Sequence, residues 1–194
     1  TDVKWAGTTA HFPSGAKIQF GYINTVADRQ NYKSAEYQFI GWDELTEFPL
    51  SDDETNPYLF LMSRVRRTTD NPVPLRVRSA SNPGDVSHEW VKARFLSEES
   101  LEALANGEHR MFFEGQRAMC DGCGHVETYE KDVIVNECSR CKSSVTMQAD
   151  RAFVPARIVD NPSLNAGEYA ANLAHLKPVT RARLMNGDWS VRED

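Results

Sequence analysis

The sequence predicts an α/β fold in which a short cysteine-bearing segment interrupts a succession of strands and helices. Strand-like apolar runs alternate with helical periodicities over most of the 194 residues, and all four cysteines lie between residues 120 and 141. About 40% of the residues are hydrophobic, which is enough to bury a core. We therefore expect an α/β domain over residues 1–109 and 151–194, with an insertion over residues 110–150.

The first elements are predicted from short local patterns. Residues 10–23 predict a β-hairpin that turns near Gly15, because apolar and polar side chains alternate after the turn. The continuous apolar run 37–42 is typical of a strand buried on both faces, as in a parallel sheet. Asn56 and Pro57 together predict a helix start, with asparagine as the N-cap and proline at the first position.

The helix that starts at Pro57 is expected to reach residue 67, with Tyr58, Leu61, Met62 and Val65 on one face. A second strand is expected over residues 75–80. A right-handed crossover through one helix is the usual link between neighbouring parallel strands. The strands near 37–42 and 75–80 should therefore lie side by side and parallel.

The second half of the chain repeats these signals. Two helices are expected over about 87–96 and 98–106, with Ser97 as the cap of the second and Gly107 at its end. Residues 151–159 predict another apolar strand, in which Pro155 disfavours a central position. A helical stripe of Tyr169, Leu173 and Leu176 and a last helix from Pro178 to Gly187 complete the prediction.

Charge and hydropathy restrict the classes of function. The net charge of −6 argues against a nucleic-acid-binding protein if the chain is taken as a whole. A local basic group follows an acidic cluster, and it is either a nucleic-acid contact or a solvated face: Arg64, Arg66, Arg67, Arg76 and Arg78. No apolar run approaches the roughly 20 residues of a membrane span, so no membrane partner is expected.

The four cysteines form two Cys-x-x-Cys pairs separated by fourteen residues: Cys120, Cys123, Cys138 and Cys141. Such pairs can close a tetrahedral Zn²⁺ shell with no open position, which is the form of a structural site in a zinc ribbon. Gly122 and Gly124 are expected to supply unusual backbone angles in the first turn. His125 is a further candidate ligand, and four free or disulfide-linked cysteines are the alternative.

Two carboxylates, Asp43 and Glu44, follow the apolar run 37–42 directly. A strand that ends in two acids has the form of a Walker B element, in which one acid holds Mg²⁺ and the other orients the attacking water. The carboxyl edge of the sheet is where α/β folds bind ligands. The alternative is an ordinary solvated turn.

The segment Ser79-Ala80-Ser81-Asn82-Pro83-Gly84 follows the second predicted strand. Its hydroxyl and amide groups could be presented at the same sheet edge as the two acids. An ordinary loop is the alternative for this segment as well.

In combination these segments resemble the large subunit of tailed-phage terminases, the motor that packages DNA. Residues 35–46 resemble the family's Walker B segment, residues 58–67 the helix after it, and residues 79–84 its coupling motif. Residues 153–156, 160–162 and 181–189 resemble the close of its ATPase domain. The resemblance keeps the family's order and covers nearly the whole chain except the cysteine region.

This resemblance implies part of a P-loop NTPase of the ASCE type, with a mostly parallel sheet and flanking helices. Asp43 would bind Mg²⁺, Glu44 would be the catalytic glutamate, and Ser81 and Asn82 would sense the nucleotide. Arg29, Lys33 and Arg64 are candidates for the arginine finger: the group's position varies in the family. The implied cofactors of the complete protein are ATP and Mg²⁺, besides the structural Zn²⁺.

The resemblance also implies the partners and the place of action. They are duplex viral DNA, a portal protein, a small terminase subunit and further copies in a homo-oligomeric ring. The protein would act in the bacterial host cytoplasm and transiently at the portal vertex of the procapsid. Clustered cysteines fit such a reducing compartment.

Two departures from the family lead us to expect a fragment. A P-loop needs a Gly-Lys step, and no glycine of this chain precedes a lysine, so the P-loop should lie upstream of Thr1. The family's nuclease domain should lie downstream of Trp189. The alternatives are a helicase-like P-loop ATPase fragment and a stand-alone zinc-ribbon module that binds nucleic acid.

Overall fold

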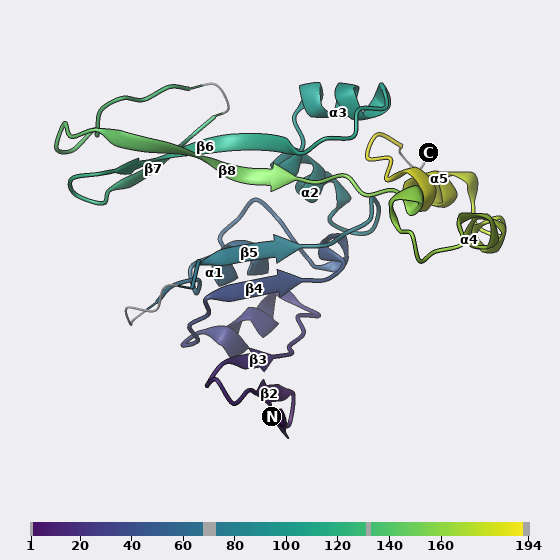
Figure 1. Cartoon of the computed structure of the whole chain (residues 1–194), viewed down its shortest axis with the longest axis horizontal. Helices are drawn as coiled ribbons and strands as arrows, with labels where there is room; N and C mark the ends of the chain where they lie inside the picture. Colours follow the sequence, from purple (N-terminus) through teal and green to yellow (C-terminus); the bar gives the residue numbers. More distant parts are fainter. Residues whose placement is uncertain (1, 68–72, 131–132, 192–194) are drawn as a thin grey trace. The chain divides into compact units, whose positions relative to one another are not determined.

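A computed structural model describes residues 2–67, 73–130 and 133–191 of the chain. The chain divides into two compact units, Thr1–Ala80 and Ser81–Asp194, which are described separately. Both units mix helices with small sheets (Figure 1). The expectation of a mostly parallel sheet is wrong: across the described ranges one two-stranded sheet is parallel, and the two three-stranded sheets are antiparallel. Nothing in this arrangement is evidence for a P-loop NTPase fold.

The first unit begins with an antiparallel sheet of three short strands, β1 (Lys4–Ala6), β2 (Thr9–His11) and β3 (Lys17–Gln19). Strands β2 and β3 form the hairpin that the sequence predicts. Gly15 has a φ of +86° in its turn, a conformation that glycine adopts without a Cβ penalty.

The parallel pair of the first unit consists of β4 (Phe39–Trp42) and β5 (Arg76–Ser79). The chain between them contains helix α1 (Pro57–Met62) and the 3₁₀ helix η2 (Leu45–Glu47). The prediction that these two strands lie side by side and parallel is therefore confirmed (Figure 1).

The apolar sequence of residues 37–42 predicted a strand buried on both faces. This prediction is wrong for β4. Phe39 remains 56% exposed, whereas Trp42 is buried. The Trp42 ring packs against Phe48 at 4.8 Å and Tyr58 at 5.6 Å between centroids. An apolar strand is buried on both faces only where other elements cover both, and the face that carries Trp42 is the one that is packed here.

Helix α1 starts where the sequence predicts. The buried Asn56 side chain accepts hydrogen bonds from the amides of Tyr58 at 2.8 Å and Leu59 at 3.2 Å, so it satisfies two of the free N–H groups of the first turn. The helix ends at Met62, earlier than the expected residue 67. Val65 instead forms a parallel bridge with Tyr37, which places it beside the start of β4.

The second unit contains the two predicted helices α2 (His88–Phe95) and α3 (Glu98–Ala105). Ser97 caps α3, because its Oγ accepts a hydrogen bond from the Ser100 amide at 3.3 Å. Gly107 follows the helix with a φ of +83°, as expected for a glycine just after a helix end.

An antiparallel sheet of three strands follows, in the order β7-β6-β8 (Figure 1). It consists of β6 (Phe112–Cys120), β7 (Val126–Tyr129) and β8 (Val145–Phe153). The predicted position of a strand over residues 151–159 is wrong. Strand β8 ends at Phe153, and the 3₁₀ helix η3 occupies Ile158–Asp160. Pairing with β6 up to Phe112 determines how far this strand extends.

A buried carboxylate joins β6 to the start of α3. Glu114 is 6% exposed, and its Oε1 accepts hydrogen bonds from the Ser97 amide, the Ser97 hydroxyl and the Ser100 hydroxyl at 3.1, 2.9 and 2.6 Å. A negative charge is favourable at a helix N-terminus, where the backbone N–H groups are unpaired. This contact links residues 14 to 17 positions apart and had no signature in the sequence.

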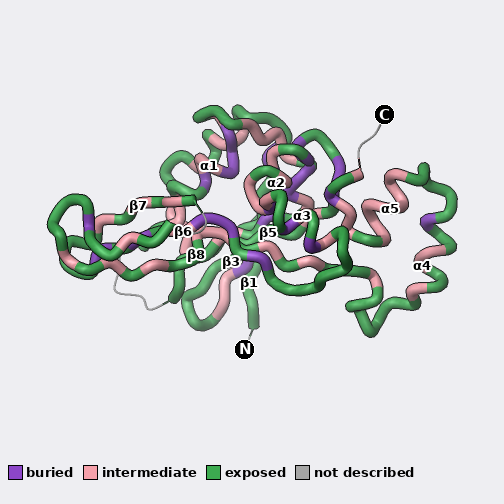
Figure 2. Tube along the Cα trace, turned by 90° about the horizontal axis from the view of Figure 1, so that it is seen from above, coloured by how far each residue is buried: buried purple, intermediate pink, exposed green. Residues whose placement is uncertain are grey.

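The chain ends with helices α4 (Ala166–Leu173) and α5 (Pro178–Asn186). Gly187 has a φ of +61° at the end of α5, which confirms the predicted stop. In the predicted stripe, Leu173 is buried but Leu176 lies beyond the helix and is 40% exposed. Along α4, four of the eight positions are exposed, three are intermediate and Leu173 is buried (Figure 2). The helix therefore contributes one fully buried side chain to the core.

Candidate functional site

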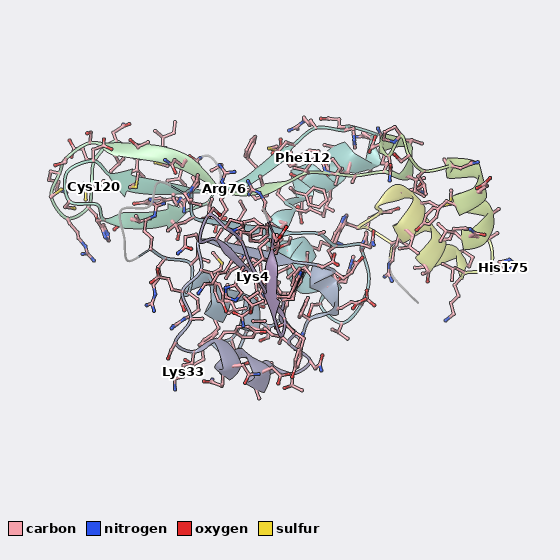
Figure 3. The ribbon with its side chains drawn as sticks, turned by 60° about the horizontal axis from the view of Figure 1, so that its bottom comes forward. Lys4, Lys33, Arg76, Phe112, Cys120 and His175 are labelled. Carbon is pink, nitrogen blue, oxygen red and sulfur yellow. The ribbon has the colours of Figure 1, made fainter. Side chains whose placement is uncertain are left out.

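The four cysteine sulfurs lie within 4.8 Å of one another. Cys120 and Cys141 bring their Sγ atoms to 3.4 Å, and Cys123 and Cys138 to 3.8 Å. The antiparallel sheet of β6, β7 and β8, with the turns that join its strands, is called the ribbon below. Cys120 is the last residue of β6 and lies at the opposite end of that strand from Phe112 (Figure 3). A tetrahedral ZnS₄ shell with Zn–S bonds of about 2.3 Å requires S···S distances of about 3.8 Å. The four residues predicted as ligands are thus brought together and could hold a metal ion such as zinc.

The first Cys-x-x-Cys pair lies on a tight turn between β6 and β7. The Cys120 amide donates a hydrogen bond to the His125 carbonyl at 2.8 Å, and the Gly124 amide donates to the Cys120 carbonyl at 3.1 Å. Gly124 has a φ of +67°, as predicted. The Cys123 amide also donates to Cys120 Sγ at 3.3 Å, a hydrogen bond that stabilises a thiolate.

The second pair adopts the same turn before β8. The Cys138 amide donates to the Ser143 carbonyl at 2.8 Å, and the Lys142 amide donates to the Cys138 carbonyl at 3.1 Å. Lys142 has a φ of +62° and therefore occupies the position that Gly124 holds in the first turn. A lysine in the left-handed region has no sequence signal, so this equivalence could not be predicted.

Gly122 does not supply an unusual backbone angle, which corrects the prediction for this residue. Its φ lies outside the positive region, and its role is space. A Cβ at Gly122 would lie 2.5 Å from Ser143 Oγ and 2.9 Å from Ser143 Cβ. Glycine is required here because the second turn approaches the first closely.

The thiols divide into two buried groups, Cys120 and Cys138, and two exposed ones, Cys123 and Cys141. The Ser143 hydroxyl, 3.4 Å away, lowers the pKa of Cys141 to about 6. The His125 amide lowers the pKa of Cys123, but hydrogen bonding to the neighbouring sulfurs outweighs it and raises that pKa to about 12. Adjacent thiolates repel, so such a set loses all its protons when a cation neutralises it.

A carboxylate beside the cysteines connects the two turns. Glu127 Oε1 lies 2.9 Å from His125 Nε2 and accepts a hydrogen bond from Ser139 Oγ at 2.6 Å. Its Oε2 accepts from the Tyr129 hydroxyl at 2.5 Å. The Ser139 bond, followed by those of Tyr129 and His125, lowers the pKa of Glu127 to about 2. His125, a candidate ligand by sequence, is paired with Glu127, and the potential metal group contains only the cysteines among the described residues.

The two predicted carboxylates follow β4 directly in the first unit. Asp43 is exposed and Glu44 is partly buried, with a φ of +49° in the left-handed region. The next residue, Leu45, is hydrogen bonded to the residue after β5: its amide donates to the Ala80 carbonyl at 3.0 Å. The Ala80 amide in turn donates to the carbonyl of Trp42, the last residue of β4, at 2.9 Å. A positive φ in a glutamate is uncommon, and no local sequence pattern predicts it here.

Ser81 and Asn82 begin the second unit. The Ser81 hydroxyl contacts the Asn82 carbonyl at 3.3 Å, and Gly84, with a φ of +131°, donates its amide to His88 Nδ1 at 3.0 Å. A nucleotide site shared by these residues and the two carboxylates stays a prediction.

The candidate arginine fingers have local partners in the first unit. Arg29 donates to the Thr55 carbonyl at 2.7 Å, and Arg64 donates to the Lys33 carbonyl at 2.7 Å. Arg64 also lies over the Phe60 ring, 5.0 Å from its centroid. These contacts hold the two guanidinium groups against their own unit.

Comparison with protein families, curated proteins and solved structures found no match to this chain. No helix within the described ranges has the length and apolar character needed to cross a membrane.

Proposed function

We propose that the chain is the second half of the ATPase domain of a terminase large subunit, which couples ATP hydrolysis to the movement of duplex DNA into a phage procapsid. The observation that carries this proposal is the parallel pair β4 and β5, with Asp43-Glu44 directly after the first strand. The Ser81-Asn82 step follows the second strand by one residue. Ligands of α/β proteins bind at the carboxyl ends of parallel strands.

In this function the two carboxylates have different roles. Asp43 binds Mg²⁺, and Glu44 accepts a hydrogen bond from the attacking water and orients it toward the γ-phosphate. Ser81 and Asn82 report the state of the nucleotide to the parts that grip DNA. The backbone cradle and the lysine for the phosphates come from a P-loop elsewhere in the complete protein, because this chain has no Gly-Lys step.

The same proposal assigns one structural Zn²⁺ to the ribbon. Four thiolates fill a tetrahedral shell and leave no position for water, so the metal does no chemistry on a substrate. Tetrahedral sulfur sites also suit iron, and elemental analysis distinguishes the two metals. The expected result is near one zinc per chain in protein purified under reducing conditions; no metal, or a disulfide among the cysteines, would remove the ribbon site.

The proposed partners follow from the packaging function. They are duplex DNA, a portal protein, a small terminase subunit and further copies of the chain in a ring, all in the host cytoplasm. Mixing the complete protein with procapsids, ATP and linear DNA should protect the DNA from added nuclease. Duplex unwinding without such protection would instead favour a helicase.

The decisive experiment compares ATP hydrolysis by the protein expressed from its complete coding sequence with that of a Glu44→Gln variant. We expect Mg²⁺-dependent turnover that the variant loses while it still binds ATP. Glu47→Gln, a change of the same kind three residues away on an exposed position, is the control and should keep the activity. Equal rates in the wild type and the Glu44 variant would reject this assignment.

A further inference from the structure

The ribbon contains a carboxylate whose hydrogen bonds reach both metal-binding turns. Glu127 lies on β7, and one of its oxygens contacts both His125 Nε2 at 2.9 Å and Ser139 Oγ at 2.6 Å. His125 belongs to the first turn, where its carbonyl accepts the Cys120 amide. Ser139 lies inside the second Cys-x-x-Cys pair, directly after Cys138.

The two turns approach each other from different parts of the sheet. The first continues β6 into β7, and the second leads into β8. A second carboxylate makes a comparable link from the first turn, since Asp121 accepts hydrogen bonds from the hydroxyls of Ser144 and Thr146, both at 2.8 Å. That link reaches residues that follow the second turn. The Glu127 link reaches inside it, between Cys138 and Cys141.

We propose that Glu127 is a positioning residue for the metal centre, which holds the second Cys-x-x-Cys turn against the first through Ser139 and so sets the affinity for zinc. The inference rests on the proposed zinc site and concerns its assembly. Groups that orient metal ligands through hydrogen bonds contribute about 10–100-fold to metal affinity. A turn held in place before the metal arrives loses less conformational entropy on binding.

Alternative roles of Glu127 predict different results. If its charge alone mattered, the removal of the Ser139 hydroxyl would leave zinc affinity unchanged. If it only stabilised β7, zinc affinity would not depend on Ser139 either. Positioning predicts that Glu127→Ala and Ser139→Ala each weaken zinc binding. It also predicts that the double variant is no weaker than the worse single variant, because each change removes the Glu127–Ser139 hydrogen bond.

The experiment measures the zinc dissociation constant of the whole chain by competition with a chromophoric chelator at pH 7.5. The variants are Glu127→Ala, Ser139→Ala and their combination. Glu130→Ala is the matched control, because Glu130 is an exposed carboxylate three residues from Glu127. We expect about 10–100-fold weaker binding for Glu127→Ala and no change for the control.

Cobalt(II) absorption provides a second readout that reports the ligand set. An unchanged thiolate charge-transfer band in Glu127→Ala would show that all four sulfurs still bind, so that weaker zinc binding reflects positioning. A wild-type chain that binds no zinc would reject the metal site and this inference with it. A wild-type chain that binds zinc, together with variants of equal affinity or additive losses, would overturn the role of Glu127 alone.

Discussion

The Leu45 amide donates a hydrogen bond to the Ala80 carbonyl at 3.0 Å, which joins the chain after β4 to the end of β5. Glu44 is the residue before Leu45, and Ser81 is the residue after Ala80. The backbone at the carboxyl ends of the two parallel strands is therefore held in register. This hydrogen bond fixes the backbone position of Glu44, the proposed catalytic residue, at the end of β4.

The two carboxylates should differ in the step that they affect. In the complete protein, Asp43→Asn should weaken Mg²⁺-dependent binding of ATP, whereas Glu44→Gln should leave binding intact and slow the chemical step. Loss of a general base typically costs about 10²–10⁴-fold in rate. Single-turnover kinetics separate binding from chemistry. A Glu44 variant with the wild-type rate would place the base at another residue.

The present chain by itself should not hydrolyse ATP, because it lacks the glycine-lysine step that holds the β- and γ-phosphates. The measurement is phosphate release with Mg²⁺ at micromolar protein. Turnover that Glu44→Gln abolishes would contradict the view that this chain carries half of the site.

Loss of one ligand should unfold the ribbon before the rest of the chain. Zinc sites of this kind supply about 10–16 kcal/mol of binding free energy, which is folding free energy in a small unit. In Cys138→Ser, amide exchange should accelerate over residues 112–153 and stay slow in α1. Removal of zinc with a chelator should give the same pattern, and zinc should reverse it. Fast exchange in α1 in these samples would mean that the metal stabilises more than the ribbon.

Substitution of the left-handed residue should change the stability of the zinc-bound ribbon in opposite directions in the two turns. Gly124→Ala should lower the stability, and Lys142→Gly should raise it. A Cβ added at Gly124 would meet no heavy atom within 4 Å, so Gly124→Ala costs only the left-handed conformation, about 1 kcal/mol. Lys142→Gly should stabilise the zinc-bound ribbon by about 0.5–1 kcal/mol for the same reason. Chemical unfolding of the zinc-saturated protein measures both. A destabilised Lys142→Gly would show that the lysine side chain makes a compensating contact.

The second unit should lose stability as the pH falls below the ordinary histidine range. Burial lowers the pKa of His88 from 6.5; the Glu89 carboxylate opposes the shift, and Arg183 adds to it. Neutral His88 accepts the Gly84 amide at Nδ1 and stacks on Trp189 at 5.4 Å. Because the folded pKa lies below the unfolded value, this contribution is complete above pH 6.5 and is lost as the pH falls through the folded pKa.

Thermal unfolding between about pH 7.5 and 5.5, which brackets the ordinary histidine pKa, tests the role of His88. The wild-type melting temperature should fall over this interval, and His88→Gln, which cannot be protonated, should show a smaller fall. The difference between the two proteins isolates the histidine from the protonation of zinc ligands. Parallel pH profiles would assign the fall to another group.

The sequence by itself determined the features that depend on a few neighbouring residues. Short patterns predicted the hairpin at Gly15, the Asn56 cap and the helix stop at Gly187, because turns and caps are built from contacts within a few positions. The cysteine cluster joins sulfurs up to 21 positions apart, and it was predicted because two Cys-x-x-Cys pairs supply the four ligands of a tetrahedral metal shell. The parallel pairing of β4 and β5 followed from the general preference for helical crossovers.

Tertiary structure decided the features that depend on residues distant in the chain. The exposure of Phe39 depends on which elements cover β4, and the end of β8 depends on its pairing with β6. Gly122 is required by Ser143, and Glu127 gains its role from Ser139. Such contacts join residues well separated in the chain. A local periodicity does not encode which polar side chains will meet. The burial and the hydrogen-bond partner of each side chain are determined only when the strands pair.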